Sequence, residues 1–403
     1  KYEASTVETG KQLTKAEIRN SSMVVSAYGS PDLSVFKYPD YSDAEVVETL
    51  ENTISDMEIS PNETYYAVRV YDYDAANNVS FYRADTNEKV SQWVETESYY
   101  VLSGFIDDET YMLVTGNDEI LFYNIASGEK NIMSIDSRGL ATNYCLNEDH
   151  SLLMICHGYG YEVIDLKKRE VLISKETEEY LSDMILSKDG KKAYCKCEGT
   201  GLCMLDTESG VFTSIDLEGH QVLQCFDSEE AYAASSDGRL LAVSCSDNML
   251  RVIEVQKEEI LAEIPFTGIR RQFIQFSDDG SRIILQGDDY YLRVFDLNQQ
   301  KFTFISVVQY NEIKKSVTDK ESNTLCLITS ADMVILNQQD FERVAQIESG
   351  EMFLPDKGKL YSSDYRTLYQ FPYMTLEMLL QEAAEQFEGE ALSELEKVRF
   401  HVD

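Results

Sequence analysis

A short pattern of two or three apolar residues, one polar residue and a turn recurs along the chain. The polar position of this pattern is occupied by Arg83, Asn124, Asp165, Asp206, Glu254, Asp296 and Asn337. Successive polar positions are 41, 41, 41, 48, 42 and 41 residues apart. A period of about 40–45 residues is typical of the four-stranded blade of a β-propeller, so the pattern predicts one blade per repeat.

The residues around the pattern predict the other strands of each blade. Turn formers precede it, as in Ser-Lys-Asp-Gly at 187–190, and an apolar strand at 192–197 separates this turn from the pattern. A second turn follows at 207–210, and a further strand at 211–217. Each repeat therefore predicts four short antiparallel strands joined by hairpin turns.

The repeats predict an all-β chain that forms a single propeller of eight four-stranded blades. Seven complete repeats span 57–351, with a partial repeat at 23–51 and a short one at 351–371. Nine candidate third strands leave seven or nine blades as alternatives. A propeller must pair its first and last strands, because an open sheet edge invites aggregation. We expect N-terminal chain to close the last blade, either at 2–7 or with the strand that starts at Met23.

The period changes near the C-terminus. The propeller domain is predicted to span residues 1–374, and a helical tail residues 375–403. Thr375 is a suitable N-cap, and apolar residues from Leu376 to Phe387 follow at helical spacing up to Gly389. A second short helix is expected from Ser393. We expect the tail to pack on the propeller, and docking to a partner is the alternative.

The repeats resemble those of bacterial WD40 propellers. Ser-Asp-Asp-Gly at 277–280, followed by Val-Phe-Asp-Leu at 294–297, is similar to the usual Ser-Pro-Asp-Gly and Trp-Asp of that family. The Trp-Asp dipeptide itself never occurs, and the Gly-His pair of the family is convincing only at Gly219-His220. The resemblance covers residues 22–374. It implies an interaction or ligand-sensing module of a larger signalling protein, in some cases membrane-anchored, with a helical C-terminal tail.

The cysteines follow the repeat. Cys156, Cys197 and Cys245 lie nine residues before the polar position, and Cys195 and Cys326 lie eleven before it. Positions two apart share one face of a strand, so these thiols are expected to fill the buried face between blades. A disulfide and a metal site that includes Cys203 are disfavoured, because equivalent positions of neighbouring blades are too far apart and zinc needs converging ligands.

The charge balance limits the partners. There are 72 Asp and Glu residues against 35 Lys and Arg, a formal charge of −37. Nucleic-acid binding needs a basic surface and is excluded on this ground. No apolar run reaches the ~20 residues that span a bilayer, so no membrane insertion is expected within this segment. The chain begins with Lys1. We therefore expect a processed chain or a fragment, and favour an extracytoplasmic ectodomain over a cytoplasmic protein.

Catalytic motifs are missing from the sequence. It contains no Gly-x-Ser-x-Gly elbow, phosphate loop or dinucleotide fingerprint, and its four His residues are scattered. We expect no cofactor, no metal and no enzymatic activity. A calcium site at Asp288-Asp289 lacks the spacing of known calcium loops. The alternative is a propeller enzyme of lactonase, lyase or hydrolase type, which would need polar residues that converge at the central channel.

Aromatic residues at strand ends and blade loops are the better candidates for binding. Tyrosine offers a large contact area with a polar end and is enriched at interfaces. The candidate binding residues are Tyr99, Tyr100, His157, Tyr159, Arg270, Arg271, Tyr290 and Tyr291. The two arginines could attract an acidic group, and packing between strands is the competing role for the tyrosines. The expected partner is an unidentified protein or peptide.

Overall fold

The computed structural model describes the chain in segments. They are residues 13–19, 22–27, 33–37, 44–71, 77–95, 100–135, 143–197, 201–217, 219–220, 222, 232–266, 273–319, 323–341, 343–348, 350–354, 358–364 and 366–372. Every element in these segments is a β-strand. No helix among them has the length and apolar character needed to cross a membrane. The helices expected at 375–403 lie outside the described residues.

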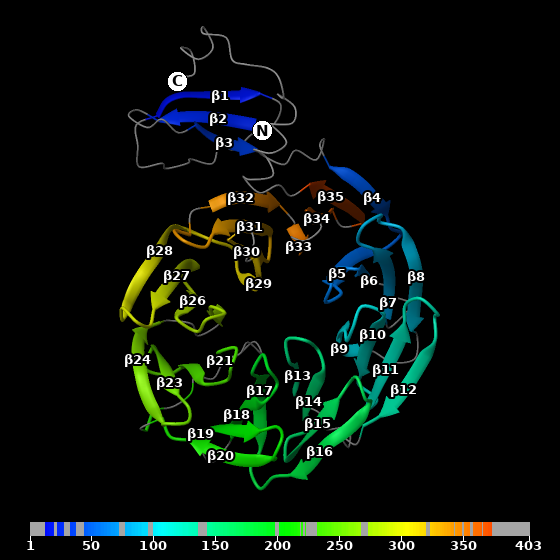
Figure 1. Ribbon diagram of the computed structural model, residues 1–403, viewed down its shortest axis with the longest axis vertical. Helices are drawn as coiled ribbons and strands as arrows, with labels where there is room; N and C mark the ends of the chain where they lie inside the picture. Colours follow the sequence, from blue (N-terminus) through cyan, green and yellow to red (C-terminus); the bar gives the residue numbers. More distant parts are fainter. Residues whose placement is uncertain are drawn as a thin grey trace. The chain divides into compact units, whose positions relative to one another are not determined.

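Residues 50–314 form a compact unit of six four-stranded antiparallel blades. The first three blades are β5 (Thr53–Ile59), β6 (Tyr65–Tyr71), β7 (Asn77–Arg83) and β8 (Lys89–Glu95); β9 (Tyr100–Phe105), β10 (Thr110–Thr115), β11 (Glu119–Asn124) and β12 (Lys130–Ser134); and β13 (Asn143–Leu146), β14 (Leu152–Cys156), β15 (Gly160–Asp165) and β16 (Glu170–Glu176). The next three are β17 (Leu181–Leu186), β18 (Lys192–Cys197), β19 (Gly201–Asp206) and β20 (Val211–Ile215); β21 (Tyr232–Ala234), β22 (Leu240–Ser244), β23 (Met249–Glu254) and β24 (Glu259–Pro265); and β25 (Phe273–Phe276), β26 (Arg282–Gln286), β27 (Tyr291–Asp296) and β28 (Lys301–Gln309). Within this unit the first strand of each blade lies innermost and the fourth outermost (Figure 1).

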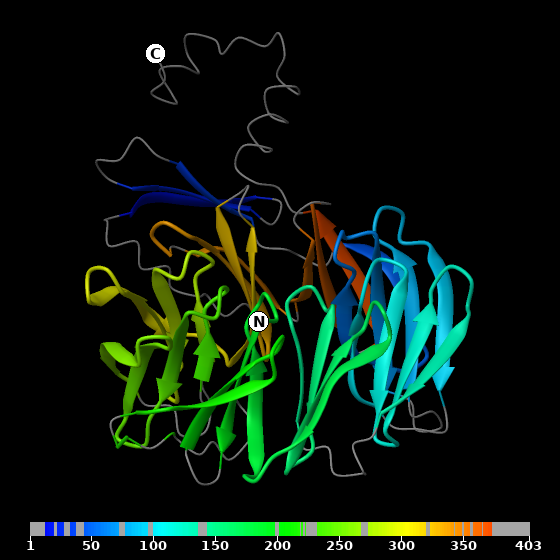
Figure 2. The ribbon, with the colours of Figure 1, turned by 60° about the horizontal axis from the view of Figure 1, so that its bottom comes forward.

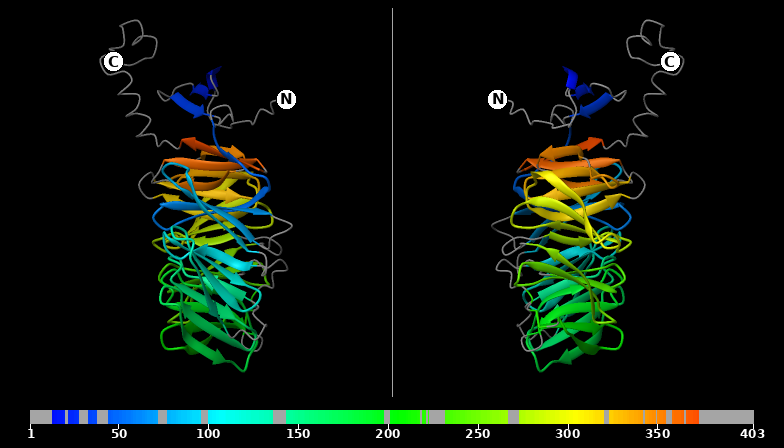
Figure 3. Two further views of the ribbon diagram at one scale, coloured as in Figure 1. Left: turned by 90° about the vertical axis from the view of Figure 1, so that its right-hand side faces the viewer. Right: turned by 90° about the vertical axis from the view of Figure 1, so that its left-hand side faces the viewer.

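The strands of each of these blades run alternately up and down (Figure 2), and each sheet is twisted, as the side views make clear (Figure 3). The twist has the usual cause, the steric preference of L-residues in extended chains. First strands of neighbouring blades contact one another from β13 to β17, from β17 to β21 and from β21 to β25. The blades therefore stack through their faces, and each buries its neighbour.

Residues 1–49 and 315–403 form the second compact unit. Its strands are β1 (Leu13–Arg19), β2 (Ser22–Ala27), β3 (Leu33–Lys37) and β4 (Glu45–Thr49) near the N-terminus, and β29 (Ile313–Asp319), β30 (Thr324–Thr329), β31 (Asp332–Asn337), β32 (Arg343–Glu348), β33 (Gly350–Leu354), β34 (Lys359–Asp364) and β35 (Thr367–Pro372) near the C-terminus. Strands β29–β32 make a seventh blade, and β33, β34, β35 and β4 make an eighth. Strands β1–β3 form a three-stranded sheet of their own.

The eight four-stranded blades confirm the prediction of an eight-bladed β-propeller. N-terminal chain does complete the last blade, but the closing strand was predicted wrongly. It is β4, which pairs with β35 through Tyr369 opposite Val46, and not the strand that contains Met23; residues 2–7, the other alternative, lie outside the described residues. Met23 lies in β2, which pairs only with β1 and β3 among the described strands. Strand β4 has five residues, none of them buried, so its sequence lacks the apolar pattern that marks the buried strands.

The recurring polar residue has a defined place in every blade from the first to the seventh. It is the last residue of the third strand, as at Asp165 in β15 and Asp206 in β19. The longer interval of 48 residues between Asp206 and Glu254 reflects the connection from Ile215 to Tyr232, which is longer than the other connections between blades. The period of the sequence is thus the period of the third strands.

The core lies on the second and third strands. In β10, β11, β14 and β22 nearly every side chain is buried, whereas most of β16 is exposed. A strand buried on both faces reads as a continuous apolar run, which is why the pattern precedes each polar residue. The predicted cysteines lie on this buried surface: Cys156, Cys195, Cys197, Cys245 and Cys326 are all buried and are thiols rather than disulfides.

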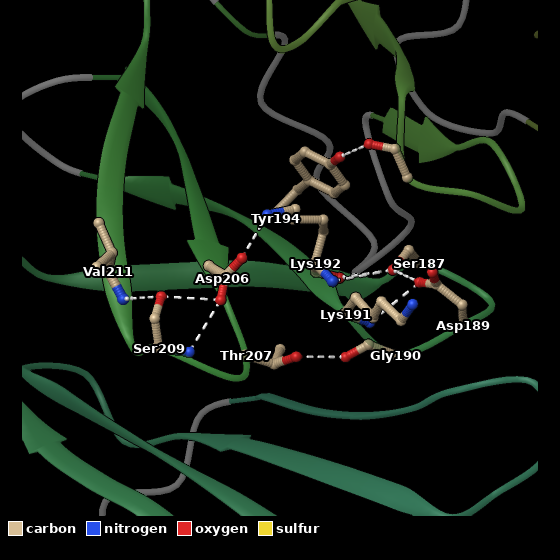
Figure 4. A network of polar contacts seen from close by, with 11 residues as sticks. Ser187, Asp189, Gly190, Lys191, Lys192, Tyr194, Asp206, Thr207, Ser209 and Val211 are labelled. Carbon is tan, nitrogen blue, oxygen red and sulfur yellow. Dashed lines mark hydrogen bonds and ion pairs between the residues drawn. The ribbon is translucent and has the colours of Figure 1, made fainter.

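Hydrogen bonds from polar side chains hold the turns of several blades, and Figure 4 shows those of the blade β17–β20. In the turn before β18, the Ser187 hydroxyl donates to Asp189 at 2.7 Å and accepts from the Lys192 N–H at 3.0 Å. Gly190 has a φ of 70°, which explains the glycine in this turn. The same Ser-to-Asp bond recurs at Ser235–Asp237 and Ser277–Asp279. The turn formers found in the sequence are therefore repeated structural parts.

The polar residue that ends the third strand holds the next turn. The Asp206 carboxylate accepts from the Ser209 N–H at 2.9 Å and forms an ion pair with Lys192 at 2.5 Å. Asn124 accepts from the Ser127 N–H in the same way at 2.8 Å. The hydrogen bond from Lys192 and those from Ser209 hold the pKa of the Asp206 carboxyl well below its usual range. Both residues place a hydrogen-bond acceptor at the end of the third strand, and only Asp206 adds a negative charge there.

Substitutions at Asp206 should separate these two contributions. At neutral pH, Asp206→Asn keeps the acceptor and should lower the free energy of unfolding by at most ~1 kcal/mol, whereas Asp206→Ala also removes the acceptor and should cost ~1 kcal/mol more. Because the folded pKa lies below the unfolded value of ~3.9, the ion pair contributes fully above that pH and is lost as the pH falls. Denaturant titrations at pH 7 and pH 3 should show the difference between wild type and Asp206→Asn shrink. An unchanged difference would contradict the ion pair.

Candidate partner-binding surface

The described candidate residues lie in two turns between second and third strands. His157 and Tyr159 lie in the turn from β14 to β15, and Tyr290 and Tyr291 at the turn from β26 to β27. Two blades, β17–β20 and β21–β24, separate them, so the four residues do not form one site. Tyr100 begins β9 opposite Thr115. The Tyr100 side chain, Tyr99, Arg270 and Arg271 lie outside what the structure describes.

The backbone of Tyr290 adopts a left-handed conformation. Its φ is 62°, and its N–H donates to the Gly287 carbonyl at 2.9 Å. Asp118 and Asn248 hold the equivalent positions of two other blades with φ of 62° and 64°. In all three, the carbonyl accepts a hydrogen bond from the residue just after the fourth strand. Asp and Asn tolerate this conformation, whereas a bulky residue there is unusual and strained.

A wide bulge in β28 lies beside this turn. The ladder pairs Tyr291 with Gln309 and Arg293 with Ile305, so residues 306–308 bulge out of register. Ser306 Oγ replaces the missing backbone partners, since it accepts from the Leu292 N–H at 3.0 Å and donates to the Val308 carbonyl at 2.8 Å. Bulges of this kind redirect side chains at sheet edges. Here the bulge presents Val307 and Val308 to solvent.

Five apolar or aromatic residues lie at the bulge and the adjoining turn, and we call them the β28 patch: Tyr290, Tyr291, Ile305, Val307 and Val308. Val307 is 83% exposed, Ile305 52% and Val308 47%, and the two tyrosines are half-buried. The Tyr310 N–H donates to the Tyr290 carbonyl at 2.9 Å, and the Gln309 amide donates to the Asp289 carbonyl at 2.9 Å. These bonds fix the bulge to the tyrosine turn. The patch is therefore a defined surface of one blade.

An ion pair lies beside the tyrosines of the patch. Arg293 donates to Asp289 at 2.9 Å, and its guanidinium lies 5.9 Å from the centre of the Tyr291 ring. The hydrogen bond from Arg293 lowers the pKa of the Asp289 carboxyl. Asp289 is thus engaged within the blade, which gives a calcium site at Asp288-Asp289 no support. The arginine orients one tyrosine of the patch instead.

The other candidate turn is held mainly by its backbone. The His157 N–H donates to the Gly160 carbonyl at 3.0 Å, and the Tyr159 carbonyl accepts from Thr177 at 2.8 Å. Tyr159 is 58% exposed and meets the Tyr180 ring edge-on at 5.5 Å. The imidazole of His157 packs against Gly160, where an added Cβ would meet Cε1 at 2.3 Å. The His157 ring is therefore in close contact with the backbone of its own turn.

Sequence reasoning found the tyrosines of the β28 patch and missed its aliphatic side chains. Ile305, Val307 and Val308 lie in a run of mostly apolar residues, Phe-Thr-Phe-Ile-Ser-Val-Val, that looks like any strand of the core. The only available signal was two consecutive valines, because they break the alternation expected of an outer strand. Tyr180 was also missed, because nothing in its neighbourhood marks it as the partner of Tyr159.

Comparisons with known proteins give the fold and no family. No protein-family description and no curated protein matches this sequence. The chain is similar in structure to the computationally designed Ika8 protein, with a TM-score of 0.59 and 12% identity over 81% of this chain and 98% of that one. It is also similar to the dihydro-heme d1 dehydrogenase NirN, solved in complex with DHE, with a TM-score of 0.56 and 13% identity over 84% and 76% of the two chains.

A third structure shows a weaker likeness. It is the β-propeller domain of Cps50 (Swd1) from Myceliophteria thermophila, with a TM-score of 0.46 and 11% identity over 66% of this chain and 94% of that one. At 12–13% identity, the first two likenesses concern the fold alone. Folds of this class carry many unrelated functions, so the function must be argued from the surface of this chain.

Relief of the backbone strain at Tyr290 should stabilise the blade. Tyr290→Asn places at this position a residue type that Asn248 already supplies in another blade, and should raise the free energy of unfolding by ~0.5–1 kcal/mol, part of the ~1–2 kcal/mol cost of a left-handed residue. Asp118→Tyr is the reciprocal control and should lower it by a similar amount. Chemical denaturation of the three proteins measures both effects. If Tyr290→Asn instead lowered the free energy of unfolding, the packing of the tyrosine side chain would outweigh the backbone strain, and the prediction would be refuted.

Close packing at Gly160 should make this position intolerant of a side chain. An added Cβ would lie 2.8 Å from the Lys175 carbonyl as well as against His157, and the carbonyl cannot move without the strand. Gly160→Ala should lower the free energy of unfolding by ~1–3 kcal/mol. Gly201→Ala is a useful comparison, because nothing lies within 4 Å of the added Cβ and only its φ of 87° opposes the change. A Gly160→Ala variant as stable as wild type would refute steric exclusion by His157 and Lys175.

Proposed function

We propose that this protein is a non-catalytic interaction module that binds a partner protein through the β28 patch. The observation that carries the proposal is the exposure of Val307 on a bulge built by Ser306. An aliphatic side chain directed into water by a specific hydrogen-bonded arrangement gives the fold no burial energy. Together with the left-handed Tyr290, it is a local departure from what stability favours, and such departures concentrate at functional sites.

The geometry of the patch favours an extended segment of the partner. Strand β28 is nine residues long and lies last in the order of its sheet. An outer strand offers backbone donors and acceptors to an added strand, and side-chain pockets give the specificity. Lys301 is the only charged residue of β28, so the usual protection of an edge by charge is weak here. The partner segment should therefore carry apolar side chains toward Val307 and Tyr291.

The charge of the chain adds a second requirement. A formal charge of −37 attracts basic segments over a distance and repels acidic ones, and it raises association rates at low salt. We expect the partner segment to combine apolar residues with flanking Lys or Arg. The buried arginines of the chain itself do not take the place of these partner cations, because they already form ion pairs within the fold. Arg69 pairs with Glu58, and Arg251 pairs with Asp247 and Glu263.

The proposal is tested with peptides selected from a displayed random library on the full 403-residue chain. Their affinities are then measured for wild type, Val307→Asp and the control Val211→Asp, which alters another exposed valine, on the outer strand β20. Val307→Asp should weaken binding at least ~10-fold, the effect of losing ~1.4 kcal/mol at a hot spot, and Val211→Asp should not. Affinities that do not respond to Val307→Asp, or a library without binders, would refute the proposal.

A further inference from the structure

Blade β17–β20 concentrates thiols on one face. Cys195 and Cys197 are two residues apart in β18, and Cys203 in β19 lies directly opposite Cys195. All three side chains therefore point to the same side of the sheet, toward the core shared with the preceding blade. The sequence interpretation treats such thiols as small apolar fillers. For Cys197 and Cys203 the surrounding residues indicate a different chemistry.

A carboxylate converges on two of these thiols. The side-chain ligand atoms of Glu179, Cys197 and Cys203 all lie within 4.8 Å of one another. Cys197 is 1% exposed and Cys203 3%, whereas Glu179 is half-buried at the end of the blade. The register between β17 and β18 explains why Glu179 lies near Cys197. Leu181 lies opposite Cys197, and Glu179 precedes Leu181 by two residues. Ligand atoms from three separate segments thus lie close together.

The spacing suits a tetrahedral metal ion. With Zn–S bonds of ~2.3 Å and tetrahedral angles, ligand atoms around zinc lie ~3.7 Å apart, so a small closure of the observed group would complete the site. Thiolate and carboxylate are both established zinc ligands. Three protein ligands leave one position of the tetrahedron for water or an external group. Among the described residues, this is the one group of side chains with such convergence.

Neighbouring blades show that the pair of thiols is particular to this one. In β21–β24 the two equivalent positions hold Cys245 and Arg251, and Arg251 forms ion pairs with Asp247 and Glu263. In β13–β16 they hold Cys156 and Glu162, and the Cys156 thiol donates to the Leu181 carbonyl at 3.3 Å. Neither neighbouring blade has a thiol at the second position, so the fold does not require one there.

We propose that Glu179, Cys197 and Cys203 bind a thiophilic divalent cation, for which Zn²⁺ is the natural candidate. Binding converts two thiols to thiolates and releases two protons. The two thiolates and the carboxylate carry three negative charges, so the site with a divalent ion has a net charge of minus one. Because the ligands come from β18, β19 and the segment before β17, a bound ion ties two strands of the blade to the segment that leads into a third. This site is separate from the β28 patch and does not depend on the proposed function.

The test uses the full chain, reduced and stripped of metal, and titrates it with Zn²⁺ by calorimetry and with Co²⁺ by absorption. We expect one equivalent of metal per chain, a thiolate-to-cobalt charge-transfer band and a thermal unfolding temperature that rises with Zn²⁺. Glu179→Gln should weaken Zn²⁺ at least ~10-fold, the smallest effect usual for loss even of an outer-shell partner. Cys203→Ser should weaken the cobalt band, because one of the two thiolate ligands is lost. Cys245→Ser, which alters the equivalent thiol of the next blade, should bind both metals like wild type.

Three results would overturn the proposal. The first is failure of the reduced chain to bind stoichiometric Zn²⁺. The second is equal Zn²⁺ affinity of wild type and Glu179→Gln. This comparison also decides the question if Cys203→Ser does not fold. Glu179 is only half-buried, so its replacement leaves the core intact. The third is loss of the cobalt band in Cys245→Ser, which would place the thiolate ligand in another blade. None of these results bears on the peptide test of the β28 patch.

Discussion

The packing of second and third strands against those of the next blade is the interaction on which the rest of this structure depends. Met112, Val114 and Phe122 of one blade share a core with Leu153, Ile155 and Ile164 of the next, and all six are buried. Burial of a large aliphatic or aromatic side chain contributes ~1.5–3 kcal/mol. No blade could bury both faces of these strands alone, so each is stable only between neighbours.

This constraint explains what could be predicted from the sequence. A strand buried on both faces must be apolar throughout, and the turn that follows must have a polar acceptor, as Asp206 and Asn124 show. The combination recurs at the spacing of the blades and placed the end of the third strand correctly in seven of the eight blades. The cysteines followed the same register, and the five that were assigned to buried faces are buried. Periodic features were predictable because one packing problem is solved again in each repeat.

Features that occur once were not predictable in this way. Strand β4 closes the last blade by backbone pairing with β35, and its exposed Val46 gives no sign of that role. The bulge of β28 depends on a single hydroxyl, that of Ser306, and the sequence around it resembles a buried strand. The approach of Glu179 to Cys197 depends on the register between β17 and β18. Each of these is a matter of local geometry that composition and period do not encode.

The candidate sites fit this division between repeated and unrepeated parts. The repeated residues hold the blades together, and their replacement would act on stability. The β28 patch and the Glu179–Cys197–Cys203 group lie where one blade departs from the others, through a strained tyrosine, an exposed valine or a second thiol. Such departures are where function is expected, because nothing in the packing demands them. The acidic surface adds an attraction for basic partners without contributing to the fold.

Reactivity of the cysteines in the native state tests the central claim most directly. Burial raises the pKa of the Cys245 thiol, and that of Cys326 to about 12, so these groups are shielded both from solvent and from ionisation. The native chain, with metal removed, would be treated with a small maleimide and the labelled residues located by mass spectrometry. We predict that Cys156, Cys195, Cys245 and Cys326 react only as the protein unfolds in denaturant. Labelling of any of these four in the native protein at the rate of a solvent-exposed thiol would contradict the packing between blades.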